Sequence, residues 1–164
     1  MKKLLLLAAS LALSAGAWAN TPYKATIECQ FDYDDFDFCS KANIAKYKNA
    51  LKTQTPNFDK KYILLNVSNS SEFIRFVALD IKNGLALPLR DAILGFKDNR
   101  GGLTGKPPVI KYSINNSFLC TWGSILAYRD AYDNVKTCYS IQDDEYSEYG
   151  KEFTRTDTPK SLED

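Results

Sequence analysis

The sequence predicts an α+β or mainly β domain: an antiparallel meander of short strands with one N-terminal helix and two disulfides. Three observations lead to this fold class. A single segment, residues 40–52, combines helical spacing of apolar residues with a capping serine. From residue 61 onward, short β-rich segments alternate with turn residues. Four cysteines fall into two pairs that are close in sequence.

The first nineteen residues predict a cleaved signal peptide. Lys2 and Lys3 precede an apolar run at 4–13, and Ala-Trp-Ala at 17–19 is a small-x-small cleavage site. The run is too short to span a bilayer, so we expect a leader and no membrane anchor. The sequence therefore predicts export to the periplasm as a mature chain that begins near Asn20.

Residues 20–150 are expected to form a single globular domain, because about 145 residues suit one hydrophobic core. From Asp143 the composition turns acidic and polar. Residues 151–164 are therefore expected to be a disordered polar tail.

The elements follow in chain order. Residues 23–31 are rich in β-formers and predict a first strand. Ser40 is placed to cap a helix that runs to about Lys52, and Thr-Pro-Asn at 55–57 ends it. Two strands are then expected, at 61–68 and 73–82.

Asn83-Gly84 is the strongest hairpin signal in the chain, because both residues accept positive φ. It predicts a return strand at 85–89, with Pro88 at a sheet edge or bulge. The polar Gly/Pro segment at 98–108 predicts a mobile hairpin loop, with a partner-contacting loop as the alternative. The remaining expected strands are 92–97, 109–114, 118–122, 125–128 and 135–141.

The cysteines predict disulfides between Cys29 and Cys39 and between Cys120 and Cys138, because sequence neighbours close the shortest loops. A metal site is the rival interpretation, but the chain has no CxxC pair and no histidine. The missing histidine also excludes Ser-His-Asp and Cys-His catalysis. We expect no metal and no cofactor, with calcium as the one candidate discussed below.

The ring between Cys29 and Cys39 contains the most unusual segment of the sequence. Four aspartates alternate with aromatic residues, and carboxylates this close repel one another unless solvated or bound. Three interpretations stay open: a calcium site, a recognition loop for a cationic protein, or a strand whose aromatic residues pack inward and whose aspartates face solvent. The candidate partner-binding residues here are Asp32, Tyr33, Asp34, Asp35, Phe36 and Asp37.

A second candidate lies between the last two cysteines. Tyr128 and Arg129 begin an alternation of tyrosine and aspartate that presents hydrogen-bonding groups to a partner, or else marks a strand end and turn. Carboxylates at 143–148 are suited in principle to glycoside hydrolysis, but a solvated acidic terminus is the favoured interpretation.

Three segments carry a resemblance to known proteins: 76–89, 112–120 and 128–135. Their strand-turn-strand pattern resembles small exported β-rich bacterial proteins, among them periplasmic immunity proteins and inhibitors that neutralise peptidoglycan hydrolases. The resemblance implies an inhibitor of a cell-wall-degrading enzyme or toxin, such as one delivered by type VI secretion. It identifies no inhibitory residue.

The residues themselves favour a binding function over catalysis. A domain that is cross-linked by disulfides and lacks histidine and free thiols offers a rigid binding surface. Rigidity reduces the entropy lost on association. A formal net charge of +1 argues against a general nucleic-acid or anionic-membrane binder. We therefore expect a protein partner, such as a cationic peptidoglycan hydrolase. The alternatives are an exported carboxylate-dependent hydrolase and a calcium-dependent envelope module.

Overall fold

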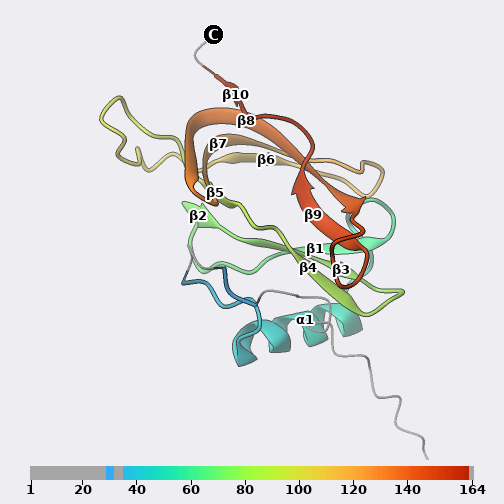
Figure 1. Ribbon diagram of the computed structural model, residues 1–164. Helices are drawn as coiled ribbons and strands as arrows, with labels where there is room; N and C mark the ends of the chain where they lie inside the picture. The colour runs from blue at the N-terminus through green and yellow to red at the C-terminus, as the bar shows by residue number, and fades with distance from the viewer. Residues whose placement is uncertain (1–28, 32–34, 163–164) are drawn as a thin grey trace, which may run out of the picture.

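The computed structural model describes residues 29–31 and 35–162 (Figure 1). It confirms a mainly β fold with one helix. The helix α1 spans Lys41–Thr53. The strands are β1 Tyr62–Asn66, β2 Phe73–Ile74, β3 Phe76–Asp80, β4 Leu85–Pro88, β5 Ala92–Leu94, β6 Val109–Lys111, β7 Leu119–Ala127, β8 Asp130–Asp143, β9 Lys151–Arg155 and β10 Lys160–Ser161.

The strands form two antiparallel sheets. One is β1-β3-β4, and the other runs β10-β8-β7-β5-β2, with β6 also paired to β7 and β9 to β8. The long strands β7 and β8 curl over into a half-barrel above the first sheet, and α1 covers its other face (Figure 1). A parallel bridge between Leu89, just after β4, and Phe153 of β9 connects the two sheets. This bridge positions the candidate site.

Alternation along β3 divides the core between two faces. Val77 and Leu79 pack with Tyr47 of α1, whereas Phe76 and Ala78 face the half-barrel. All five residues of β3 are buried, because the strand is central and both of its faces are covered.

The helix begins where the sequence predicts. The Ser40 side chain accepts a hydrogen bond from Asn43 N at 3.3 Å, which satisfies one of the free N–H groups of the first turn. Asn43 Nδ2 donates to Asp37 O, and the Tyr47 hydroxyl donates to Phe38 O, both at 2.8 Å. These bonds attach the disulfide loop to α1.

Both expected disulfides, Cys29–Cys39 and Cys120–Cys138, are present. Cys120 and Cys138 stand directly opposite each other on β7 and β8. The expected strand at 23–31 is not formed where it can be judged, since residues 29–31 are irregular and 23–28 lie outside the described residues. The expected signal peptide also lies outside them.

The expected strand 73–82 is two strands, interrupted at Arg75. The Arg75 side chain is fully buried, with its Cζ 4.3 Å from the centre of the Phe73 ring. The hairpin that follows has a four-residue loop instead of a two-residue Asn-Gly turn, because Asp80 pairs with Leu85. Asp80 Oδ1 accepts the backbone N–H groups of residues 82 and 83 and so closes this wider loop.

The segments 118–122 and 125–128 are one strand, β7, whose register shifts between Gly123 and Ile125. A Cβ at Gly123 would lie 2.5 Å from Leu94 O, so the close approach of β5 requires glycine. The expected disorder of 151–164 is wrong for 151–155 and 160–161, which are β9 and β10. Phe153 is buried at 1% exposure, and the pairing of β9 with β8 orders this segment.

Within the described residues, no helix is both long enough and apolar enough to cross a bilayer.

Candidate functional site

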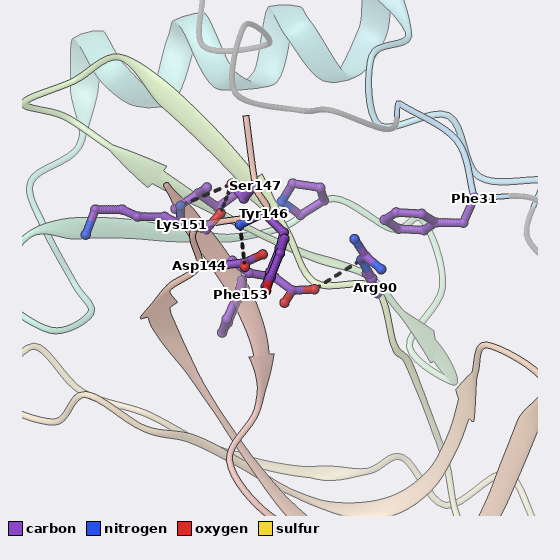
Figure 2. Close-up of a pocket in the computed structure, with 10 residues that line it drawn as sticks. Phe31, Arg90, Asp144, Tyr146, Ser147, Lys151 and Phe153 are labelled. Carbon is purple, nitrogen blue, oxygen red and sulfur yellow. Dashed lines mark hydrogen bonds and ion pairs between the residues drawn. The ribbon is translucent and has the colours of Figure 1, made fainter. Parts of the chain in front are cut away.

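The candidate site is a groove at the junction of the two sheets, where the end of β4 meets β9. We call it the β4–β9 groove. It consists of two hollows of about 260 Å³ and 180 Å³, and Arg90, Glu152 and Phe153 line both of them (Figure 2). The first hollow is completed chiefly by Phe31, Pro88, Tyr146 and Lys151, and the second by Asp91, Tyr128, Thr154 and Arg155.

Arg90 connects the groove to the disulfide loop. Its Nε lies 3.2 Å from Glu152 Oε1, and its Cζ lies 5.8 Å from the centre of the Phe31 ring. Figure 2 shows the Arg90 side chain beside the Phe31 ring, with a dashed line for the ion pair of Arg90. Phe31 is buried and belongs to the ring closed by Cys29 and Cys39, so Arg90 links this ring to β9.

A turn between β8 and β9 presents an aromatic side chain at the first hollow. Asp144 Oδ1 accepts a hydrogen bond from Tyr146 N at 3.0 Å, and Ser147 Oγ donates to Lys151 O at 2.8 Å (Figure 2). These bonds fix the turn, while the Tyr146 side chain is 90% exposed. A large aromatic held this way offers contact area at little entropic cost.

The second hollow contains a buried acidic group. Asp91 is 6% exposed, and its Oδ2 lies 3.2 Å from Arg155 Nε. Burial raises the pKa of Asp91 above its ordinary value, and the attraction of Arg155 opposes this shift only in part. For Arg155, burial lowers the pKa of the guanidinium, but the attraction of Asp91 and the interactions with Tyr132 and Tyr139 together outweigh burial and raise that pKa.

Tyr139 extends this polar cluster into the half-barrel. Burial, together with the neighbouring Asp91 carboxylate, raises the pKa of the phenol well above its ordinary value. The hydroxyl lies beside Asp91 and Thr121 but is not aligned for a hydrogen bond with a described residue. The cluster therefore combines a carboxylate, a guanidinium and a phenol in a low-dielectric setting.

The residues predicted from the disulfide loop take different positions. Asp35 is exposed, whereas Asp37 Oδ1 accepts a hydrogen bond from Cys39 N at 2.7 Å and so shapes the loop. Phe36 is half-buried, with its ring 4.8 Å from that of Phe38. Asp32, Tyr33 and Asp34 lie outside the described residues.

The second predicted pair lies at the β7–β8 turn. Tyr128 lines the second hollow of the groove. Arg129 has a positive φ of 63°, and its Cζ lies 4.7 Å from the centre of the Tyr128 ring. The structure thus brings Tyr128 and Phe31, from the two predicted segments, to the same groove.

Sequence reasoning missed four charged residues of the groove: Arg90, Asp91, Glu152 and Arg155. The first two follow a predicted strand immediately, which was an available signal. The last two were hidden by the expectation of a disordered tail, because Lys-Glu-Phe-Thr-Arg at 151–155 contains a single strongly apolar residue and shows no strand periodicity.

The described residues contain no cluster of three or more acidic, histidine or cysteine side chains suited to a metal ion. The aspartates behind the calcium interpretation fall partly outside them, so that interpretation stays a prediction. Of the 143–148 carboxylates, Asp143 pairs with Lys151 at 3.3 Å.

No family model, curated protein or solved structure matches this chain. Its function is therefore inferred from the site alone.

Proposed function

We propose that this protein is a periplasmic inhibitor or immunity protein that blocks a cell-wall-degrading enzyme by occlusion. One observation carries the proposal: Arg90 contacts both Phe31 and Glu152 and so links the disulfide loop to the β4–β9 groove. A protein partner needs a surface with apolar anchors at its centre and charges around them.

The side chains of the groove suit protein recognition. Tyr128 and Tyr146, which are 45% and 90% exposed, supply aromatic contact area, whereas Phe31 is buried and lines the first hollow from the core side. The ion pair between Arg90 and Glu152 is half-exposed, so it is available to exchange partners on binding. The two disulfides hold the surface in place, and disulfides are typical of exported proteins.

Charge supports an enzyme partner of basic character. The loop beside the groove contains four aspartates in its sequence, and those that are described, Asp35 and Asp37, are exposed. Hydrolases that act on the polyanionic cell wall are often cationic, so opposite charge would speed their encounter.

The test uses a cationic muramidase on purified peptidoglycan. The protein should slow turnover, and Arg90→Ala combined with Glu152→Gln should weaken inhibition by at least about tenfold, as loss of a central pair does. Arg100→Ala in the exposed 98–107 loop is the matched control and should inhibit like the parent. Inhibition by no basic hydrolase, or equal loss in both variants, contradicts the proposal.

A second candidate is an exported hydrolase, and Asp91 is the observation that favours it. Asp91 and Glu152 line the same hollow, and a buried carboxyl with a raised pKa is suited to general acid catalysis. The pure protein would then degrade peptidoglycan unaided, and Asp91→Asn would abolish that activity. Absence of turnover by the parent protein decides against it.

A further inference from the structure

Exposed apolar side chains gather at one edge of the half-barrel. None of them lines the β4–β9 groove. Nine large hydrophobic residues are exposed in the described part of the chain, and four of them fall within 109–118. We call this segment the 109–118 edge. Its exposed members are Val109 at 43%, Tyr112 at 41%, Ile114 at 45% and Phe118 at 43%.

The loop that carries these side chains is preformed. Lys60 N donates to Ile114 O at 2.8 Å, and Asp59 N donates to Asn116 O at 3.3 Å. Asn116 Oδ1 accepts a hydrogen bond from Phe118 N at 3.0 Å. A loop held by its backbone in this way keeps its apolar side chains exposed without support from their own burial.

Lysines surround the same edge. Lys111 ends β6, and Lys60 sits against the loop at Ile114. Lys136 of β8 lies opposite Trp122 of β7 in the sheet, and Trp122 lies opposite Val109 of β6. The Nζ atoms of Lys111 and Lys136 lie 5.2 Å and 5.4 Å from the centre of the Trp122 ring. Among the described residues, no carboxylate forms an ion pair with Lys60, Lys111 or Lys136.

We propose that the 109–118 edge docks on the surface of a membrane that contains anionic phospholipids. Exposed aromatic and aliphatic side chains beside lysines are typical of interfacial binding, with the apolar groups at the acyl boundary and the ammonium groups at the headgroups. The small net charge of the whole chain conceals this local excess of positive charge.

A lipid surface fits the edge better than a protein does. Lysine is depleted at protein interfaces, whereas here Lys111 and Lys136 flank the apolar residues and are exposed. The apolar side chains extend from a loop and a short strand beside it, which is the arrangement that shallow insertion into a bilayer requires.

The experiment is co-sedimentation of the protein, purified from the exported fraction, with two kinds of vesicle. One is pure phosphatidylcholine, and the other is an equal mixture of phosphatidylcholine and phosphatidylglycerol. The parent and all variants have the same N-terminus, so a difference in vesicle binding between them is caused by the substitutions. The parent should bind the anionic vesicles and bind neutral ones more weakly by at least about tenfold, since each lysine near an anionic surface contributes about fivefold.

Two pairs of variants separate the apolar from the charged contribution. Ile114→Asp with Phe118→Asp should abolish binding, whereas Leu103→Asp, at a residue of equal exposure (42%) in another loop, should not. Lys111→Gln with Lys136→Gln should weaken binding to anionic vesicles by about 25-fold. The matched control is Lys48→Gln with Lys52→Gln, on exposed positions of α1, which should bind like the parent.

The proposal is overturned if the parent binds neither vesicle, or if the edge variants bind as it does. Equal loss in the edge variants and their controls also overturns it. Circular dichroism of every variant checks that the fold is kept. Arg90→Ala, in the groove, should leave vesicle binding unchanged, so this proposal and the proposed inhibitory function succeed or fail separately.

Discussion

Arg155 Nε lies 3.2 Å from Asp91 Oδ2, and this ion pair connects β9 to the segment between β4 and β5. The parallel bridge from Leu89 to Phe153 lies close by. Polar and apolar contacts thus cooperate to hold a C-terminal strand whose composition alone suggests disorder. Glu152 and Arg155 are in place at the groove only because β9 is folded.

Burial of Asp91 should make stability depend on pH in a defined direction. Its folded pKa is raised above the ordinary value of 3.8, so protonation favours the folded state. The contribution of Asp91 is fully favourable below pH 3.8 and is lost as the pH rises through the raised folded pKa. We expect the stability of the parent relative to Asp91→Asn to increase as the pH falls from 7 to about 4.

Urea unfolding of both proteins at a series of pH values measures this difference. The comparison removes the contributions of the other carboxylates, which the two proteins share. A difference that stays constant with pH, or that shrinks on acidification, would show that the Asp91 pKa is not raised in the folded protein.

Phe153 tests whether β9 belongs to the folded domain. Its ring lies in the core with Phe58, at a centroid distance of 6.0 Å, and its side chain is 1% exposed. Phe153→Ala should therefore destabilise the protein by about 3–5 kcal/mol in urea unfolding, as truncation of a buried aromatic does. A disordered tail would give no loss, and Leu162→Ala, near the end of the described chain and 38% exposed, serves as the control.

Ser40 should stabilise α1 through its cap. Ser40→Ala removes the side-chain acceptor for Asn43 N and should cost about 1 kcal/mol of unfolding free energy. Ser40→Asp restores an acceptor and should recover most of that stability. If alanine and aspartate give the same midpoint in urea, the capping hydrogen bond contributes nothing.

The elements that the sequence predicts correctly depend on local chemistry. The cap at Ser40 and the spacing after it define α1, and the short separations of the cysteines define both disulfides. The hairpin at Asn83-Gly84 is also local, although Asp80 widened its loop by accepting two backbone N–H groups.

The elements that were missed depend on tertiary contacts. The break at Arg75 occurs where the chain leaves one sheet for the other, which no local pattern records. The groove unites residues from positions 31, 90, 128 and 152, so sequence proximity could not assemble it. Lys-Glu-Phe-Thr-Arg at 151–155 has one strongly apolar residue, and only its pairing with β8 makes it a strand.

Asn134 should control the order of the projecting 98–107 loop (Figure 1). Its Oδ1 accepts from Lys97 N and its Nδ2 donates to Lys97 O, both at 2.9 Å, while its φ is 48°. Asn134→Gly keeps the backbone conformation and removes both bonds. We expect trypsin to cleave more rapidly after Arg100, with a stability loss of about 1–3 kcal/mol.

Faster cleavage confined to this loop is the result that distinguishes an anchor from general destabilisation. Asn69→Gly, at an exposed turn, provides the matched control for the flexibility of glycine. Cleavage of the Asn134 variant at the parent rate would mean that the loop is held by other contacts, such as the Lys97–Asp133 ion pair.

The two disulfides should contribute nearly equally to stability despite their different settings. Cys120–Cys138 closes 18 residues and Cys29–Cys39 closes 10, and loop entropy predicts about 3 kcal/mol for the longer ring and only about 0.5 kcal/mol less for the shorter. We expect the two Cys→Ala pair variants to differ by that small amount in urea unfolding. A much larger loss for the Cys120–Cys138 pair would show that the bond also holds β7 to β8 in the folded state. A negligible loss for the Cys29–Cys39 pair would show that the hydrogen bonds from Asn43 and Tyr47 already fix the loop.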